Sequence, residues 1–179
     1  MILVLNGSPN SNSKSMTITN QLIADKKNVK LINAYDLELD SCDDCKFCTT
    51  NIGCVKSDDM DQIYQFLEET DSLIVSSPIY FGALSDKMMK IINRFQRYYG
   101  QKYDLEDLNF PTIKTIIFIT TQGSEKSKMI NGANLTMDIV STLFEAKNIY
   151  SINSFQSDDF DPIKNEVIIN KINEAKSML

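Results

Sequence analysis

The chain has 179 residues and a mass of 20.3 kDa, which is enough for one domain with a buried core and too little for two. Its formal charge of -6 and its isoelectric point near 4.7 argue against nucleic acid as the main partner, because phosphate binding needs a basic face. The chain has no histidine, which excludes Ser-His-Asp triads, Cys-His dyads and histidine-ligated zinc. Chemistry must come from other side chains or from a bound cofactor, and hydride or electron transfer suits that limit.

The N-terminal segment Met1–Asn6 is mostly apolar, lacks basic residues and leads directly into a turn. This pattern predicts a core strand rather than a signal peptide. No apolar run approaches the roughly eighteen residues needed to span a bilayer, so we expect no membrane association. We therefore expect a cytoplasmic protein whose thiols are mostly reduced.

Apolar runs alternate with amphipathic stretches along the whole chain. Ten elements are predicted, in chain order: strand Ile2–Asn6, helix Ser15–Lys26, strand Val29–Asn33, helix Asp58–Glu69, strand Ser72–Ser77, helix Ala83–Tyr98, strand Ile113–Thr121, helix Ala133–Ala146, strand Tyr150–Phe155 and helix Pro162–Ser177. Strands that alternate with helices indicate a single α/β domain over residues 1–179, with a parallel sheet covered by helices on both faces. For five strands, the flavodoxin-like doubly wound order 2-1-3-4-5 is favoured.

The loop after the first strand, Asn6–Ser15, is suited to phosphate binding. Gly7 permits a tight turn, and the hydroxyl and amide side chains of the loop are neutral hydrogen-bond donors. A phosphate here would meet free backbone N–H groups and the positive end of a helix dipole, and Lys14 could add one charge. Neither G-x-G-x-x-G nor G-x4-G-K-[ST] is present, so the loop alone is equally typical of an ordinary capped helix.

Two later loops are expected at the same edge, because ligands of doubly wound sheets bind at the carboxyl ends of strands. Ser76–Gly82 follows the third strand, where backbone N–H groups could bind a planar heterocycle while Tyr80 or Phe81 packs against it. Thr120–Ser124 follows the fourth strand and is polar and glycine-containing. Each loop alone is typical of an ordinary turn, but three in matching places favour a ligand site.

Three motifs resemble those of the flavodoxin-fold NAD(P)H-dependent FMN reductase family, especially its branch of iron–sulfur flavoproteins. They are Gly7-Ser8-Pro9, the cysteine stretch that ends Gly53-Cys54-Val55-Lys56-Ser57-Asp58-Asp59-Met60, and Ser77-Pro78-Ile79-Tyr80-Phe81-Gly82. The second half of the chain agrees in element order alone. The resemblance implies FMN as cofactor, NAD(P)H as co-substrate, and a small acceptor such as a quinone, a flavin or a nitro compound. It also implies a homodimer or homotetramer.

The resemblance further implies roles for individual residues of the three loops. The FMN phosphate would be held by Ser8, Asn10, Ser13, Lys14 and Ser15. The isoalloxazine would be lined by Pro78, Ile79, Tyr80, Phe81 and Gly82, with Thr121, Gln122 and Gly123 at its rim. No side chain is expected as a general acid or base, because the flavin carries the chemistry.

All four cysteines lie within thirteen residues, in a long irregular stretch at about residues 36–57. Their C-x2-C-x2-C-x5-C spacing resembles the iron–sulfur flavoprotein motif, which implies a [4Fe–4S] cluster with these ligands: Cys42, Cys45, Cys48 and Cys54. Reduced thiols that pack the loop or a subunit interface are the alternative, because simple FMN reductases of the family also carry cysteines here. Zinc is disfavoured by the spacing, and disulfides are disfavoured by the compartment.

Charges near the cysteines oppose a cluster in part. Asp40, Asp43 and Asp44 would repel a group of net negative charge, and Lys46 and Lys56 offset this repulsion incompletely.

Three functions remain open at this point. The leading hypothesis is an FMN-dependent NAD(P)H oxidoreductase, and the runner-up is an electron carrier with FMN and a cluster that receives electrons from a ferredoxin-like donor. The third is an interaction module that has lost its cofactor. The intact Gly7-Ser8-Pro9 turn and the Ser77–Gly82 loop disfavour that third hypothesis.

Overall fold

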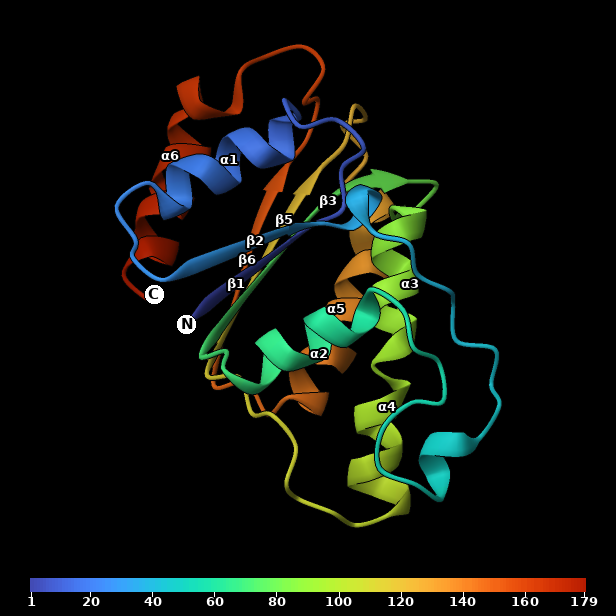
Figure 1. The fold of residues 1–179 in the computed structure, drawn as a ribbon. Helices are drawn as coiled ribbons and strands as arrows, with labels where there is room; N and C mark the ends of the chain where they lie inside the picture. The colour runs from blue at the N-terminus through green and yellow to red at the C-terminus, as the bar shows by residue number, and fades with distance from the viewer.

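A parallel β-sheet crosses the molecule, with helices on both of its faces (Figure 1). The computed structural model describes residues 1–179. The parallel strands follow the order β2 (Val29–Asn33), β1 (Ile2–Asn6), β3 (Ser72–Tyr80), β5 (Thr115–Thr121) and β6 (Asn148–Ser154). This confirms the predicted α/β class and the doubly wound order of five parallel strands.

The sheet separates two hydrophobic cores. Helices α1 (Lys14–Ile23) and α6 (Glu166–Lys176) cover one face, while α2 (Met60–Glu68), α3 (Asp86–Arg94) and α5 (Asn131–Leu143) cover the other (Figure 1). The two cores arise because successive side chains of a strand point to opposite faces of the sheet, as strand β1 shows. Leu3 and Leu5 pack into the larger core, and Ile2 and Val4 pack into the smaller one.

The predicted helix Ala83–Tyr98 is wrong in its first residues. Strand β3 runs through Pro78 to Tyr80 and turns back into a short antiparallel strand, β4 (Ala83–Leu84). The two turn residues, Phe81 and Gly82, have φ of 51° and 84°, as a tight hairpin turn of this twist requires. The proline is tolerated because β1 ends opposite Ser76, so β3 has a free edge beyond that residue.

The same predicted helix is also divided further on. Helix α3 ends at Arg94, and α4 (Gln96–Tyr99) continues into a π-helical turn over Gly100–Asp104. A Cβ at Gly100 would lie 2.5 Å from the Cys48 carbonyl oxygen, so the cysteine stretch packs directly on this turn. The helical period alone does not reveal this close packing, because it comes from a distant segment of the chain.

The remaining boundaries differ from expectation by a few residues. The last predicted helix is divided into a 3-10 turn at Pro162–Lys164 and α6, which Asn165 caps. The cysteine stretch is irregular, as expected, apart from a short 3-10 turn at Phe47–Thr49. No helix has both the length and the apolar character needed to cross a bilayer.

Gly7 fixes the first loop against the start of α3. Its N–H donates to the Ser76 carbonyl at 2.7 Å, and a Cβ at Gly7 would lie 2.8 Å from Ser85 Oγ and 2.9 Å from Met88 Cβ. We expect Gly7→Ala to lower the free energy of unfolding by about 2 kcal/mol, because the added methyl overpacks this contact. Urea unfolding measures the loss. Ser11→Ala, at an exposed position of the same loop, is the control, and equal stability of both variants would contradict the packing argument.

Candidate functional site

The three predicted loops converge at one edge of the sheet. Parallel pairing sets Asn6 of β1 beside Ser76 of β3, and Pro78 of β3 beside Thr121 of β5. The chain therefore leaves β1, β3 and β5 at neighbouring places, as expected for a doubly wound fold. Asn6 also reaches across to β2, where its side-chain amide donates to Asn33 Oδ1 at 3.0 Å.

The first loop ends in an anion-accepting helix terminus. Ser13 caps α1 by accepting the Met16 N–H at 3.2 Å, and its hydroxyl lies 3.1 Å from the hydroxyl of Ser15. The N–H groups of Lys14 and Ser15 make no hydrogen bond within the chain, and the first turn of α1 has no acidic residue. Free N–H groups, two hydroxyls and the helix dipole thus meet at one place, as a phosphate requires.

Ser8 and Asn10 shape the turn that leads to this terminus. The buried Ser8 accepts the Asn10 N–H on its hydroxyl at 3.2 Å, and Asn10 Oδ1 accepts the Asn12 N–H at 2.9 Å. These acceptor positions are already used, so the Ser8 hydroxyl proton and the Asn10 amide N–H₂ remain as donors for a ligand.

The second loop presents aromatic surface beside the phosphate cradle. Phe81 is fully exposed and Tyr80 is about half exposed, at 49%. A large apolar side chain that is wholly exposed and held at positive φ is unusual, and such strain gathers at functional sites. Ile79 differs, because its side chain is part of the core and leaves its backbone for any ligand.

The third loop contributes backbone and one amide side chain. Thr121 is a buried strand residue, and the Gln122 amide N–H₂ donates to the carbonyls of Ser124 and Lys126 at 2.8 and 3.1 Å. Gln122 Oε1 is buried and has no hydrogen-bond partner, so it is free to accept a hydrogen bond from a ligand. Gly123 packs against Asp158, where a Cβ would collide with the carboxylate.

The convergence of the loops does not create a deep cavity. None of the five main cavities of the molecule is lined by these three loops. A ligand there would lie on the edge of the sheet, with its phosphate at α1 and a planar ring over the β3–β4 hairpin. The donor set and the exposed aromatic fit FMN.

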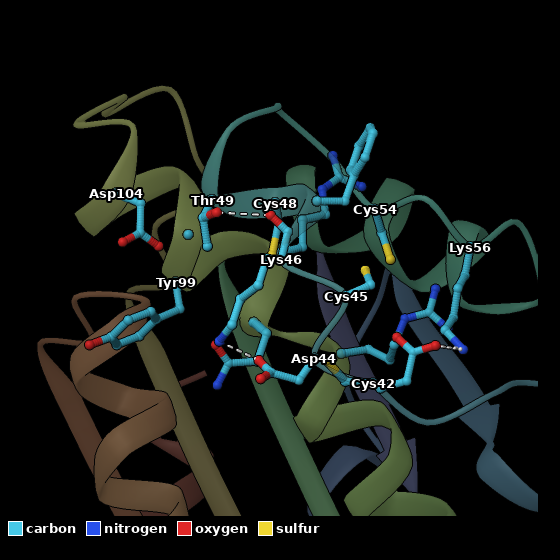
Figure 2. Close-up of a pocket in the computed structure, with 16 residues that line it drawn as sticks. Cys42, Asp44, Cys45, Lys46, Cys48, Thr49, Cys54, Lys56, Tyr99 and Asp104 are labelled. Carbon is cyan, nitrogen blue, oxygen red and sulfur yellow. Dashed lines mark hydrogen bonds and ion pairs between the residues drawn. The ribbon is translucent and has the colours of Figure 1, made fainter.

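The four cysteines line a separate cavity of about 230 Å³, at the far end of α3 from the loops. Figure 2 shows their side chains around this space, with Lys56 on one side and Tyr99 and Asp104 on the other. All four thiols are free, and burial raises the pKa of the Cys48 thiol, as do the neighbouring cysteines. The volume greatly exceeds the roughly 10–15 Å³ that one water molecule needs, so a larger group fits.

The cysteines do not form a site for a single metal ion. No group of three or more Cys, Asp or Glu side chains is close enough to hold one. Tetrahedral zinc would need its thiolate sulfurs about 2.3 Å from one metal, and the side chains are not gathered in that way. A cluster of several iron atoms separates its four thiolates further, so the donor chemistry and the open space fit that group.

The expected repulsion from nearby carboxylates is weaker than the sequence indicates. Asp43 pairs with Lys56 at 3.1 Å, and Asp44 pairs with Lys46 at 2.6 Å (Figure 2). The hydrogen bond with Lys56 holds the pKa of Asp43 below its usual value, and the hydrogen bond with Asp44 raises the pKa of Lys46. Two arginines that no local pattern connects to the cysteines also line the cavity.

Arg94 and Arg97 reach the cysteines from α3 and α4. Arg97 stacks on Tyr64, with its guanidinium 4.4 Å from the ring centre. Arg94 is buried and donates from Nη1 to Asp58 Oδ2 at 2.7 Å. Burial alone would lower the pKa of Arg94, but the hydrogen bond with Asp58 and the electrostatic interactions with Tyr64 and Cys54 raise it above its usual value. Neither arginine is expected at this cavity from the sequence, where the run of basic residues between Lys87 and Lys102 is the only indication of them.

The Arg94–Asp58 ion pair holds the backbone at the start of the cysteine stretch. Asp58 Oδ2 also accepts the Asp40 N–H at 3.0 Å, and Arg94 Nη1 donates to the Asp40 carbonyl at 3.0 Å. Burial raises the pKa of Asp58, but hydrogen bonds from Arg94 and from the Asp40 and Met60 N–H groups hold it below the usual 3.8. The carboxylate therefore stabilises the fold at neutral pH.

We expect Asp58→Asn to cost about 3 kcal/mol at pH 7, because it leaves a buried guanidinium without its charge partner. The contribution of Asp58 is fully present above 3.8 and is lost as the pH falls through the lower folded pKa. The difference from wild type should therefore shrink in urea unfolding experiments as the pH is lowered below 4. A difference that stays constant down to pH 2 would refute this account.

Residues 1–154 match the family model described as NADPH-dependent FMN reductase. The chain is 27% identical over 97 residues to an iron-sulfur flavoprotein of Methanocaldococcus jannaschii, which covers 52% of this chain and 50% of that protein. The chain thus matches about half of the length of this curated relative.

Solved structures share the fold over nearly the whole chain. The NAD(P)H:quinone oxidoreductase from Methanothermobacter marburgensis superposes with a TM-score of 0.73 at 13% identity and covers 99% of this chain and 96% of its own. An FMN-dependent NADH-azoreductase from Bacillus anthracis, in complex with FMN, gives 0.62 at 11% identity, with coverages of 98% and 95%. At such identities these likenesses show the fold. The family match spans most of the sequence, and the chain belongs to the NADPH-dependent FMN reductase family.

Proposed function

We propose that the protein is an FMN-dependent NAD(P)H oxidoreductase that reduces a small acceptor such as a quinone, a flavin or a nitro compound. The observation that carries this proposal is the convergence of an anion-accepting helix terminus and an exposed aromatic hairpin at one edge of the sheet. FMN, when bound, would supply the chemistry by accepting a hydride from NAD(P)H and passing two electrons to the acceptor. The family and the names of its structural neighbours support the same reaction class.

The residues of this chain would bind and orient the cofactor. Ser13, Lys14 and Ser15 would hold the phosphate through hydroxyls, free N–H groups and one positive charge. Phe81 would cover one face of the flavin ring, and backbone N–H groups of the hairpin would stabilise negative charge that develops on the reduced ring. Gln122 Oε1, which has no partner in the chain, would accept a hydrogen bond at the rim.

A second candidate is an electron carrier that contains FMN and a [4Fe–4S] cluster and receives electrons from a ferredoxin-like donor. The specific observation in its favour is that all four cysteines line one cavity of about 230 Å³, which has space for a group larger than one metal ion. The names of the curated relatives support it. The two candidate functions share the flavin site. They differ in whether electrons pass directly between the flavin and a small acceptor or also pass through a cluster.

We also propose a cytoplasmic homodimer or homotetramer. Exposed apolar side chains gather on α5 and α4, and they support a contact with a second copy: Leu135, Ile139 and Tyr99. Analytical ultracentrifugation of the purified chain would test this, and a monomer at micromolar concentration would contradict it.

The proposed function is tested by an absorption spectrum of anaerobically purified protein, with FMN, iron and zinc quantified. Bound FMN without iron supports the reductase, and FMN with iron supports the carrier. No bound flavin, together with no binding of added FMN, would refute both. Rapid mixing with NADH and with NADPH then shows whether either nucleotide reduces the flavin and which one does so faster.

We expect Lys14→Glu to weaken FMN binding about tenfold and to leave riboflavin binding unchanged, because only FMN carries the phosphate. An acidic residue in the first turn favours the helix dipole, and Lys14 makes no ion pair in the structure, so the variant should remain folded. Fluorescence titration with the two flavins measures both affinities. Lys14→Gln, which removes the charge without reversing it, should give an intermediate loss. Equal weakening of FMN and riboflavin would place the phosphate elsewhere.

We expect Phe81→Asn to weaken FMN and riboflavin equally, because both share the ring that Phe81 would cover. Asparagine tolerates positive φ better than phenylalanine, so the free energy of unfolding should stay the same or rise by up to about 1 kcal/mol. Phe81→Tyr keeps the aromatic ring and should bind both flavins like wild type. Unchanged flavin affinity in Phe81→Asn would remove this residue from the site.

A further inference from the structure

Arg94 has more hydrogen-bond donors than partners. Its side chain is 1% exposed and lines the cysteine cavity. Nη1 donates to Asp58 and to the Asp40 carbonyl, but Nε and Nη2 are buried without a partner. A buried guanidinium with unpaired N–H groups costs free energy, which indicates that an acceptor belongs beside it.

The surroundings of Arg94 define what that acceptor must be. Each of the four cationic side chains at the cavity pairs with a carboxylate, so the charges there nearly balance. The two buried N–H groups of Arg94 without a partner still favour an acceptor of negative charge. The wall also carries the four thiols, which bind soft metals as thiolates. An anionic group that contains sulfur and iron satisfies both conditions, and a free carboxylate or phosphate satisfies only the first.

We propose that Arg94 donates hydrogen bonds to sulfur atoms of a [4Fe–4S] cluster bound by the four cysteines and supplies the positive charge that tunes its reduction potential. This inference rests on the cluster-bearing candidate function. Arg94 would contact the electron-accepting group directly, and Asp58 acts through Arg94 as the positioning residue. Asp58 holds the guanidinium in place, and Gly100 lets the Cys48 backbone pack closely on the π-helical turn at the same cavity.

The electrostatic consequence has a definite sign. Reduction adds one electron to the cluster and breaks no bond, so its negative charge increases. A nearby positive charge and N–H donors stabilise the reduced form more than the oxidised form, which raises the reduction potential. Removal of Arg94 should therefore lower the potential, and removal of the Asp58 carboxylate should raise it.

The experiment uses the full chain purified without oxygen, with iron, acid-labile sulfide and FMN quantified in each sample. The reduction potential is measured by titration with dithionite as electron donor, followed by visible absorbance and electron paramagnetic resonance. We expect Arg94→Met to shift the potential to more negative values and to retain less iron. Arg94→Lys keeps the charge but loses the forked donor geometry, so its potential should lie between those of wild type and Arg94→Met.

Asp58→Asn is the matched control, because it breaks the same ion pair. A purely structural role for Arg94 would make both variants shift the potential in the same direction or leave it unchanged, whereas the proposal requires opposite directions. The double variant Arg94→Met/Asp58→Asn removes both charges and should be more stable than Arg94→Met, because no buried charge is left unpaired. Its potential should lie below that of Asp58→Asn alone.

Three results would overturn the inference. They are a wild-type protein without iron, an Arg94→Met variant with an unchanged or raised potential, and an Asp58→Asn variant with an unchanged or lowered potential. The FMN content of the samples shows whether the Arg94 inference alone is wrong or the oxidoreductase proposal is wrong as well. Bound FMN without iron ends the inference on Arg94 and leaves the oxidoreductase intact, whereas iron without FMN contradicts the oxidoreductase.

Discussion

The parallel pairing of β1, β3 and β5 is the constraint on which the flavin edge depends. Parallel strands begin at one edge and end at the other, so Asn6, Pro78 and Thr121 come together although about 115 residues separate the first from the last. Hydrogen bonds between the strands set this register, and Gly7 locks the first loop onto the start of α3. Without the pairing, the three loops would be three unrelated polar turns.

Helix α3 connects the two candidate sites. Its N-cap, Ser85, touches the flavin loops, and Arg94 at its last turn lines the cysteine cavity. At 1.5 Å per residue, these two residues are about 14 Å apart along the helix axis. One rigid element thus sets the separation between the place where a flavin would bind and the place where a cluster would bind. The ion pair between Arg94 and Asp58 fixes the position of the cysteine cavity, because the same carboxylate also binds the backbone at the start of the cysteine stretch.

Much of the fold and of the flavin edge could be predicted from local pattern. Buried strands, amphipathic helices and turn residues produce signals within ten residues, and strand order follows from general rules of α/β folds. The β3–β4 hairpin escaped prediction because Tyr80-Phe81-Gly82 has no alternation beyond it and Pro78 suggests a strand end. The packing of Cys48 on the π-helical turn at Gly100 escaped for another reason, since the two residues are 52 positions apart in the chain.

The amino-acid sequence by itself determined the chemistry that is available: no histidine, one phosphate-compatible loop, an aromatic loop and four clustered thiols. It also indicated carboxylates that would repel a cluster at those thiols. Only the tertiary structure decided the electrostatics there, by pairing Asp43 and Asp44 with lysines and by placing Arg94 and Arg97 at the cavity. The physical reason is range. Strand, helix and turn signals are local in sequence, whereas the charge at a buried site is the sum over everything that folding brings near it.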